Sequence, residues 1–177
     1  MQIRPGSLLV AHPAHAPRHA SKHVVLITES TRMGTMGLTL NMPDPHHLTT
    51  LMHEKGFNWS LDDQLYTGGY YNSSSMILLH SSEWGSTSTM QVAEDWAISS
   101  DTLMLEKLEQ YNMPYHYRIF VGCTGWKANE LSLELNKRSP QWIVIDNPSS
   151  GLVVADAEDQ WDLALMECSH NAVDSWL

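Results

Sequence analysis

Short apolar runs alternate with turn-forming residues along the chain, a pattern typical of a protein with many β-strands. Seven of these runs contain four to eight residues, rich in Val, Ile, Leu or aromatic side chains. The strands that they predict lie at 7–12, 23–29, 37–41, 64–67, 75–80, 115–122 and 141–146. Segment 86–97 fits one or two further strands, and segment 152–155 fits a strand or a sheet edge.

Helical spacing of apolar residues marks four other segments. In the first, Leu48, Leu51 and Met52 fall on one face, and the run Ser99-Ser100-Asp101 offers N-cap residues for the second. The predicted helices lie at 48–55, 102–111, 124–138 and 158–168. Because strands and helices intermix without a strict βαβ period, we expect an α+β fold with a mixed sheet, in a single domain over residues 1–177.

Charge and composition narrow the classes of partner. Twenty Asp and Glu residues outnumber ten Lys and Arg residues, which gives a net charge of −10 at pH 7. Nucleic-acid binding and anionic membranes both require basic patches, and no Lys or Arg follows Arg138, so both are disfavoured. No apolar run approaches the roughly 20 residues that span a bilayer. Two cysteines and no signal-peptide pattern favour a cytoplasmic location.

Several short motifs follow one another in a characteristic order. They are Ala11-His12-Pro13, the run Gly34-Thr35-Met36-Gly37-Leu38-Thr39-Leu40-Asn41 with Pro43, Gly68-Gly69 followed by Met76–His80, and Gly122-Cys123-Thr124-Gly125-Trp126 followed by Glu130-Leu131. In order and spacing they resemble the YqgE/AlgH family of bacterial proteins over nearly the whole chain. The resemblance implies a bent mixed sheet that curls toward a pseudo-barrel, with helices packed outside. It implies no assigned activity, cofactor or catalytic residue, although the family is often labelled as transcriptional regulators.

The chain also departs from the family pattern at several positions. Pro17 and Ala20 stand where an Asp and a Phe are usual, and Met42 replaces a basic residue before the proline. Tyr70 follows the two glycines in place of a proline, and Cys123 replaces an aromatic residue. These positions belong to surfaces that we expect to be functional, so the resemblance implies a divergent member.

The glycines of these motifs are the first candidate site. Six of them, which we expect at strand ends, are Gly34, Gly37, Gly68, Gly69, Gly122 and Gly125. Glycine there serves a turn or a close backbone approach, or else it opens a pocket with free N–H groups for an anion. Neither a GxxxxGK[ST] nor a GxGxxG phosphate motif is present. Asn41 and His80 end strands beside such turns and serve local hydrogen bonds or, if they meet, a small polar site beside Gly68-Gly69.

Three further features carry weaker chemical signals. Cys123 is expected in a turn before a helix, where a thiol pKa can fall, although a small packing residue is the simpler interpretation. His15 and His19 share the i, i+4 spacing of metal ligands, but Pro13 and Pro17 argue against a helix there, so we expect solvated loop histidines and no metal or other cofactor. Trp126 closes the last glycine motif.

We therefore expect a non-enzymatic binding or regulatory protein that acts through a partner protein or a small ligand. The expected site includes Asn41, Gly68, Gly69, His80 and the segment 122–126. The alternative is an enzyme, such as a hydrolase, that uses His80 or Cys123 in that cleft. A DNA-binding regulator is the third hypothesis, and charge argues against it. The sequence leaves the oligomeric state open.

Overall fold

The computed structural model describes residues 3–175, and its strands form one nine-stranded sheet. The outermost residues of the predicted 1–177 domain, 1–2 and 176–177, lie outside the described residues. The strand order is β6-β7-β5-β8-β3-β2-β1-β9, with β4 beside β8. The strands are β1 (Leu8–Ala11), β2 (Val24–Thr31), β3 (Gly34–Thr39), β4 (Leu65–Thr67), β5 (Tyr71–Ser81), β6 (Met90–Gln91), β7 (Trp96–Ser99), β8 (Tyr117–Lys127) and β9 (Trp142–Ile145).

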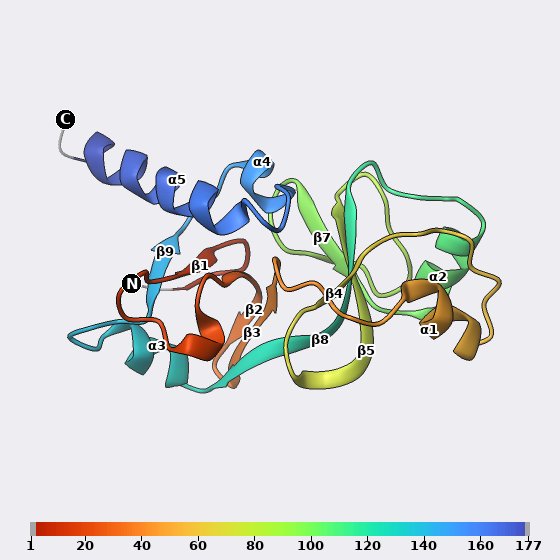
Figure 1. The fold of residues 1–177 in the computed structure, drawn as a ribbon, viewed down its shortest axis with the longest axis horizontal. Coiled ribbons are helices and arrows are strands. Elements are labelled where there is room, and N and C mark those ends of the chain that lie inside the picture. Colours follow the sequence, from red (N-terminus) through yellow and green to blue (C-terminus); the bar gives the residue numbers. More distant parts are fainter. Residues whose placement is uncertain (1–2, 176–177) are drawn as a thin grey trace.

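Strand β8 joins the two halves of this sheet (Figure 1). Its first part, through Cys123, pairs with β5, with an irregularity between Val121 and Cys123, and its last part, from Thr124, pairs with β3. Gly122 lies at this irregularity with a φ of 70°, a backbone conformation that favours glycine. All strand pairs are antiparallel except β4 with β8, so the predicted mixed sheet of an α+β fold, curled toward a barrel, is confirmed.

The helices cover both faces of one half of the sheet and lie beside its other half. They are η1 (Arg18–Ala20), α1 (Leu48–Glu54), α2 (Thr102–Glu109), α3 (Glu130–Leu135), α4 (Ser150–Val153) and α5 (Gln160–Asp174). Leu131 of α3 packs with Leu9 of β1, whereas Ala164 of α5 packs with Leu8. Neighbouring strand residues point to opposite faces, so α3 and α5 cover opposite faces of the sheet. Helices α1 and α2 lie at the other end of the molecule (Figure 1).

Two sequence predictions of secondary structure are wrong. Residues 124–127 continue β8 instead of starting a helix, because they pair with β3, and only Glu130–Leu135 of the predicted helix is helical. Segment 152–155 is not a strand, since Ser150–Val153 forms the short helix α4 whose Leu152 and Val153 enter the core. No helix within residues 3–175 is both long and apolar enough to cross a bilayer.

Candidate functional site

Glycines allow β3 and β8 to approach each other closely along their paired ends. Gly34 lies opposite Lys127 and Gly37 opposite Thr124, while Gly125 of β8 lies opposite Met36. A Cβ at Gly34 would overlap the carbonyl oxygen of Trp126, and one at Gly37 would overlap Val25. We call residues 34–37 and 124–127 the β3–β8 seam, and its glycines serve close packing.

The Gly68-Gly69 turn packs beside the start of this seam. The Gly68 N–H donates to the Val121 carbonyl at 2.9 Å, and its carbonyl accepts from the Thr39 N–H at 2.8 Å. A Cβ at Gly68 would overlap the Gly122 carbonyl oxygen, and one at Gly69 would overlap the backbone of Cys123. The structure thus brings all six candidate glycines onto β3, β8 and the adjoining turn, where most of their backbone groups serve sheet pairing.

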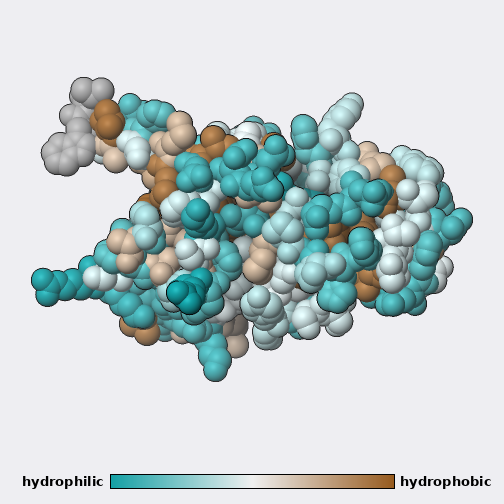
Figure 2. Space-filling view, in the orientation of Figure 1, coloured by the Kyte–Doolittle hydropathy of each residue, from teal (hydrophilic) through white to brown (hydrophobic). Residues whose placement is uncertain are grey.

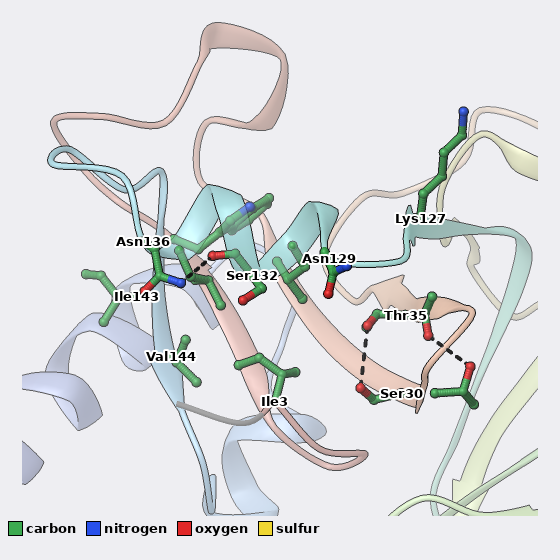
Figure 3. Close-up of a pocket in the computed structure, with 14 residues that line it drawn as sticks. Ile3, Ser30, Thr35, Lys127, Asn129, Ser132, Asn136, Ile143 and Val144 are labelled. Carbon is green, nitrogen blue, oxygen red and sulfur yellow. Dashed lines mark hydrogen bonds between the residues drawn. The ribbon is translucent and has the colours of Figure 1, made fainter.

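A hollow of about 490 Å³ opens between α3, β9 and the tip of the β2–β3 hairpin (Figure 3). We call it the α3 hollow. Hydroxyl and amide side chains of Ser30, Thr35, Asn129, Ser132 and Asn136 border it. Its apolar lining comes from Ile3, Leu131, Leu135, Trp142, Ile143 and Val144. It therefore combines an apolar wall with several hydrogen-bonding groups, as small-molecule sites do.

A second hollow, of about 570 Å³, adjoins the α3 hollow along the hairpin tip. We call it the Met33 hollow, because the side chain of Met33 at its border is 86% exposed. Tyr71, 60% exposed, and the Trp126 ring also border it. The residues that line both hollows are Thr31, Gly34, Thr35 and Lys127. The end of the β3–β8 seam thus lies between two adjoining hollows.

One carboxylate holds the tryptophans of these two hollows. Glu134 of α3 accepts through Oε2 from the Trp142 indole N–H at 3.1 Å, the Trp126 indole N–H at 3.3 Å and the Gln141 amide at 2.7 Å. The two indole rings meet edge to face, with centroids 6.5 Å apart. Since Trp142 lines the α3 hollow and Trp126 the Met33 hollow, Glu134 fixes a wall of each.

Cys123 lines a third, smaller hollow of about 290 Å³, which we call the Ser99 hollow. It adjoins the Met33 hollow at Glu29 and Met36. Cys123 lies inside β8, so the prediction of a turn before a helix is wrong at this residue. Its thiol is buried and donates to the Tyr71 carbonyl at 3.5 Å, and burial raises its pKa, which disfavours the reactive thiolate.

His80 is fully buried and is not among the residues that line this hollow, although its hydrogen-bond partner Ser99 is. Its Nδ1–H donates to the Ser81 carbonyl at 3.0 Å, so Nε2 accepts from the Ser99 hydroxyl at 2.8 Å. Ser99 also contacts the Thr89 hydroxyl at 2.7 Å. Burial lowers the pKa of His80, which keeps the imidazole neutral.

Asn41 forms local backbone bonds instead of joining His80. Its Oδ1 accepts from the Val24 N–H at 3.0 Å, and its Nδ2 donates to the Lys22 carbonyl at 2.8 Å. Both polar groups of the side chain are therefore occupied in tying the end of β3 to the loop before β2. Pro43 forms an isolated bridge with Tyr66 of β4, and Pro13 lies in the loop after β1.

The histidine loop shows no arrangement for a metal. The His15 ring stacks on the His12 ring, with centroids 4.0 Å apart, and His19 lies on η1. Burial, and then the neighbouring His15, lower the pKa of His12. Within the described part of the chain, no group of three or more His, Cys, Asp or Glu side chains could hold a metal ion.

Sequence reasoning missed most of the polar border of the α3 hollow. Thr31, Lys127, Asn129 and Ser132 read as ordinary exposed polar residues, and no motif connects them. They meet because β8 extends to Lys127 and α3 begins only three residues later. Asn129 alone gave a local signal, since Asn tolerates the left-handed conformation that it adopts, with a φ of 65°.

Two solved structures are similar in fold. The solution structure of the AlgH protein from Pseudomonas aeruginosa matches with a TM-score of 0.75 at 23% identity, over 95% of this chain and 91% of that one. The crystal structure of a protein from Corynebacterium diphtheriae matches with a TM-score of 0.68 at 21% identity, over 89% and 84% of the two chains.

Sequence comparison agrees with the fold. A UPF0301 protein of Marinomonas sp. is 28% identical over 78% of this chain and 74% of its own length. A UPF0301 protein of Xanthomonas oryzae is 27% identical over 89% and 85% of the two chains. The family model described as AlgH-like matches residues 8–172. From the match over nearly all of its length, this chain belongs to the AlgH-like family.

Proposed function

We propose that this chain is a non-enzymatic binding protein whose small ligand lies in the α3 hollow. The observation that carries the proposal is the α3 hollow itself, which has about 490 Å³ of space and a mixed lining. This volume lies in the range of small-molecule sites, roughly 300–1,000 Å³. The side chains around it offer hydroxyl and amide groups beside an apolar wall (Figure 3).

The charge of the lining narrows the ligand. Among residues 3–175, Lys127 is the only charged side chain that borders the α3 hollow, in a chain with a net charge of −10. A neutral or singly anionic molecule with an apolar part and hydrogen-bonding groups fits this lining better than a polyphosphate. The molecular face in Figure 2 is largely hydrophilic, with hydrophobic residues in separate groups. On this face, therefore, no broad apolar patch stands out as an alternative binding surface.

A thermal-shift screen with a blocked variant tests the proposal. Ser132 is exposed on α3, and its hydroxyl has no hydrogen-bond partner among the described residues, so Ser132→Phe fills the hollow without breaking a bond. Ser73→Phe on β5 is the matched control, because Ser73 is exposed and lines none of the three hollows. Metabolites and nucleotides are added to chelator-treated protein.

A ligand at 100 times its Kd stabilises the native state by about 2.7 kcal/mol, which raises Tm by about 5–10 °C in a chain of this size. We expect such a shift with one compound class in the wild type and in Ser73→Phe, and its loss in Ser132→Phe. An equal shift in Ser132→Phe would place the ligand elsewhere. If no class shifts Tm, a protein partner at the Met33 hollow becomes the better form of the proposal, and Met33→Ser should then weaken capture of that partner.

The second candidate function is an acyl hydrolase, which the 2.8 Å contact between His80 Nε2 and Ser99 Oγ favours. A neutral imidazole that accepts from a serine hydroxyl is the pairing that activates a nucleophile. The burial of both residues and the contact of Ser99 with Thr89 favour a structural network instead. A fluorophosphonate probe decides between them, because only an activated serine is modified. Mass spectrometry should find Ser99 unlabelled, and stoichiometric labelling would establish the hydrolase.

A further inference from the structure

Strand β9 forms one edge of the sheet, and half of its backbone groups point away from the sheet. Its neighbour β1 turns the N–H of Ala11 toward β2, where it donates to the His23 carbonyl. Backbone groups alternate in direction along a strand, so the N–H and C=O groups of Leu8 and Val10 point the other way, toward β9. There they form hydrogen-bonded pairs with Ile145 and Ile143. The N–H and C=O groups of Trp142 and Val144 point outward, and within residues 3–175 they have no hydrogen-bond partner.

The sequence of this edge does not protect it from pairing. Edge strands are usually blocked by a charged side chain, a proline or a bulge. The run Trp-Ile-Val-Ile of β9 has none of these, and three of its residues are β-branched. Pro140 and Pro148 lie outside the strand, so they limit the length of any added strand without preventing it.

We propose that β9 pairs antiparallel with β9 of a second copy of this chain, about a two-fold axis at Ile143. In this register Ile143 faces its own copy in a non-hydrogen-bonded pair, and Trp142 faces Val144 on both sides of the axis. Each of those two pairs exchanges both of its N–H···O bonds, so the dimer forms four new backbone hydrogen bonds. All four outward-pointing groups of each copy are then satisfied.

The charges beside β9 favour a second copy in this orientation. Lys137 and Arg138 precede the strand, and Asp146 follows it directly. Antiparallel pairing places Asp146 of one copy opposite Pro140 of the other, two positions from Arg138, whereas parallel pairing would bring like charges together. The flanks of β9 are thus self-complementary, as a two-fold interface requires. The second strand would also run beside the α3 hollow, which Ile143 and Val144 line (Figure 3).

Such an interface is small. Four residues per copy form its centre, well below the roughly 20–30 residues per side of a stable complex, so we expect a weak dimer with a Kd of about 10 µM to 1 mM. Because two copies each carry a net charge of −10, moderate salt should strengthen the dimer by screening the overall repulsion, until it also screens the Arg138–Asp146 pairs.

Cross-linking of Ile143→Cys tests the register. A non-hydrogen-bonded pair brings the two Cα atoms to about 4.5 Å, which is within the range for a disulfide. In a Cys168→Ser background, oxidation with copper–phenanthroline should convert Ile143→Cys to a covalent dimer. The matched control is Leu133→Cys, an exposed apolar position on α3 that is 68% exposed and outside the edge. Equal cross-linking of the two variants would overturn the proposal.

Sedimentation of variants without cysteine substitutions gives an independent test. The wild type should change from monomer to dimer as concentration rises to about 1 mM, the weak end of the expected range. Val144→Pro removes one outward N–H, a change that edge strands tolerate, so it should stay folded and monomeric. Arg138→Glu should weaken the dimer at least threefold, and the double variant with Asp146→Arg should restore it. A wild type that stays monomeric throughout, even if it binds an extended peptide, would overturn the second-copy proposal.

Discussion

Glu134 allows a quantitative test of how the walls of the two hollows are held in place. The substitution Glu134→Leu leaves the indole N–H groups of Trp126 and Trp142 and the amide of Gln141 without their acceptor. The control Glu134→Gln retains a side-chain oxygen in nearly the same position, so its effect isolates the loss of charge.

The cost follows from the burial of each donor. An unsatisfied buried donor costs about 1–3 kcal/mol, and this full range applies only to Trp142, which is 7% exposed. Trp126 and Gln141 are half-buried and can reach water, so we assign them about 0.5 kcal/mol each. The free energy of unfolding should therefore fall by about 2–4 kcal/mol in Glu134→Leu and by about 1 kcal/mol in Glu134→Gln.

Urea unfolding followed by tryptophan fluorescence and by far-UV circular dichroism measures both variants. We expect the native emission of Glu134→Leu to shift to longer wavelength, because its tryptophans lose their fixed positions. If Leu and Gln destabilise the protein equally, or if Leu costs less than about 1 kcal/mol, the carboxylate does not hold these walls, and the reasoning about the hollows fails.

Three further experiments test glycine packing, the Asp101 carboxylate and the reactivity of the thiols. Gly68→Ala places a Cβ against a carbonyl oxygen of β8, so the free energy of unfolding in urea should fall by at least about 2–3 kcal/mol. In the control Gly151→Ala the new Cβ meets nothing within 4 Å, so the same quantity should rise by up to about 1 kcal/mol because alanine favours the helix α4. Burial alone would raise the pKa of Asp101, but hydroxyl and amide donors outweigh it and lower the pKa to about 2. Its stabilising effect should therefore be complete above pH 4 and be lost as pH falls toward 2, and Asp101→Asn should flatten that part of a stability profile. Iodoacetamide at pH 7 should label native Cys123 more slowly than Cys168, because Cys123 is the more buried; faster labelling of Cys123 would revive the reactive-thiol hypothesis.

The sequence predicted the elements whose signals are local. The buried runs that became β1, β2, β5 and β9 were found within a few residues, because each has apolar residues bounded by turn residues. The fold class followed from their mixture with helices, and the family resemblance added the curl of the sheet. Helix α2 was also predicted, with Ser99, Ser100 and Asp101 as candidate N-caps, and the structure shows that Asp101 is the cap: its carboxylate accepts from the Met104 N–H at 2.8 Å.

The errors concern segments that long-range pairing decides. Ala128, Leu131 and Leu135 have helical spacing, which favoured a helix over 124–138. Residues 124–127 are extended instead, because they pair with β3. This pairing joins residues about 90 positions apart, so no local pattern reports it. It also decides the site, because it carries Lys127 to the hairpin tip, and places Asn129 at the start of α3, on the border of the α3 hollow.

The separation of Asn41 from His80 has a similar cause. Both residues end strands beside glycine turns, which suggested one polar cluster. The structure shows that Asn41 faces the loop before β2, while His80 lies in β5 against Ser99 of β7. The sequence gives strand ends, but it does not say which ends share one edge of a curled sheet.

The most direct test of the central claim is to map the ligand on the protein by nuclear magnetic resonance. A compound class that raises Tm is titrated into isotopically labelled protein, and backbone amide shifts are followed. The account predicts the largest shifts at Thr31, Thr35, Asn129 and Ser132 around the α3 hollow, with none of comparable size near His80 or Asn41. Shifts centred on His80 and Ser99, with the hairpin tip unchanged, would contradict it.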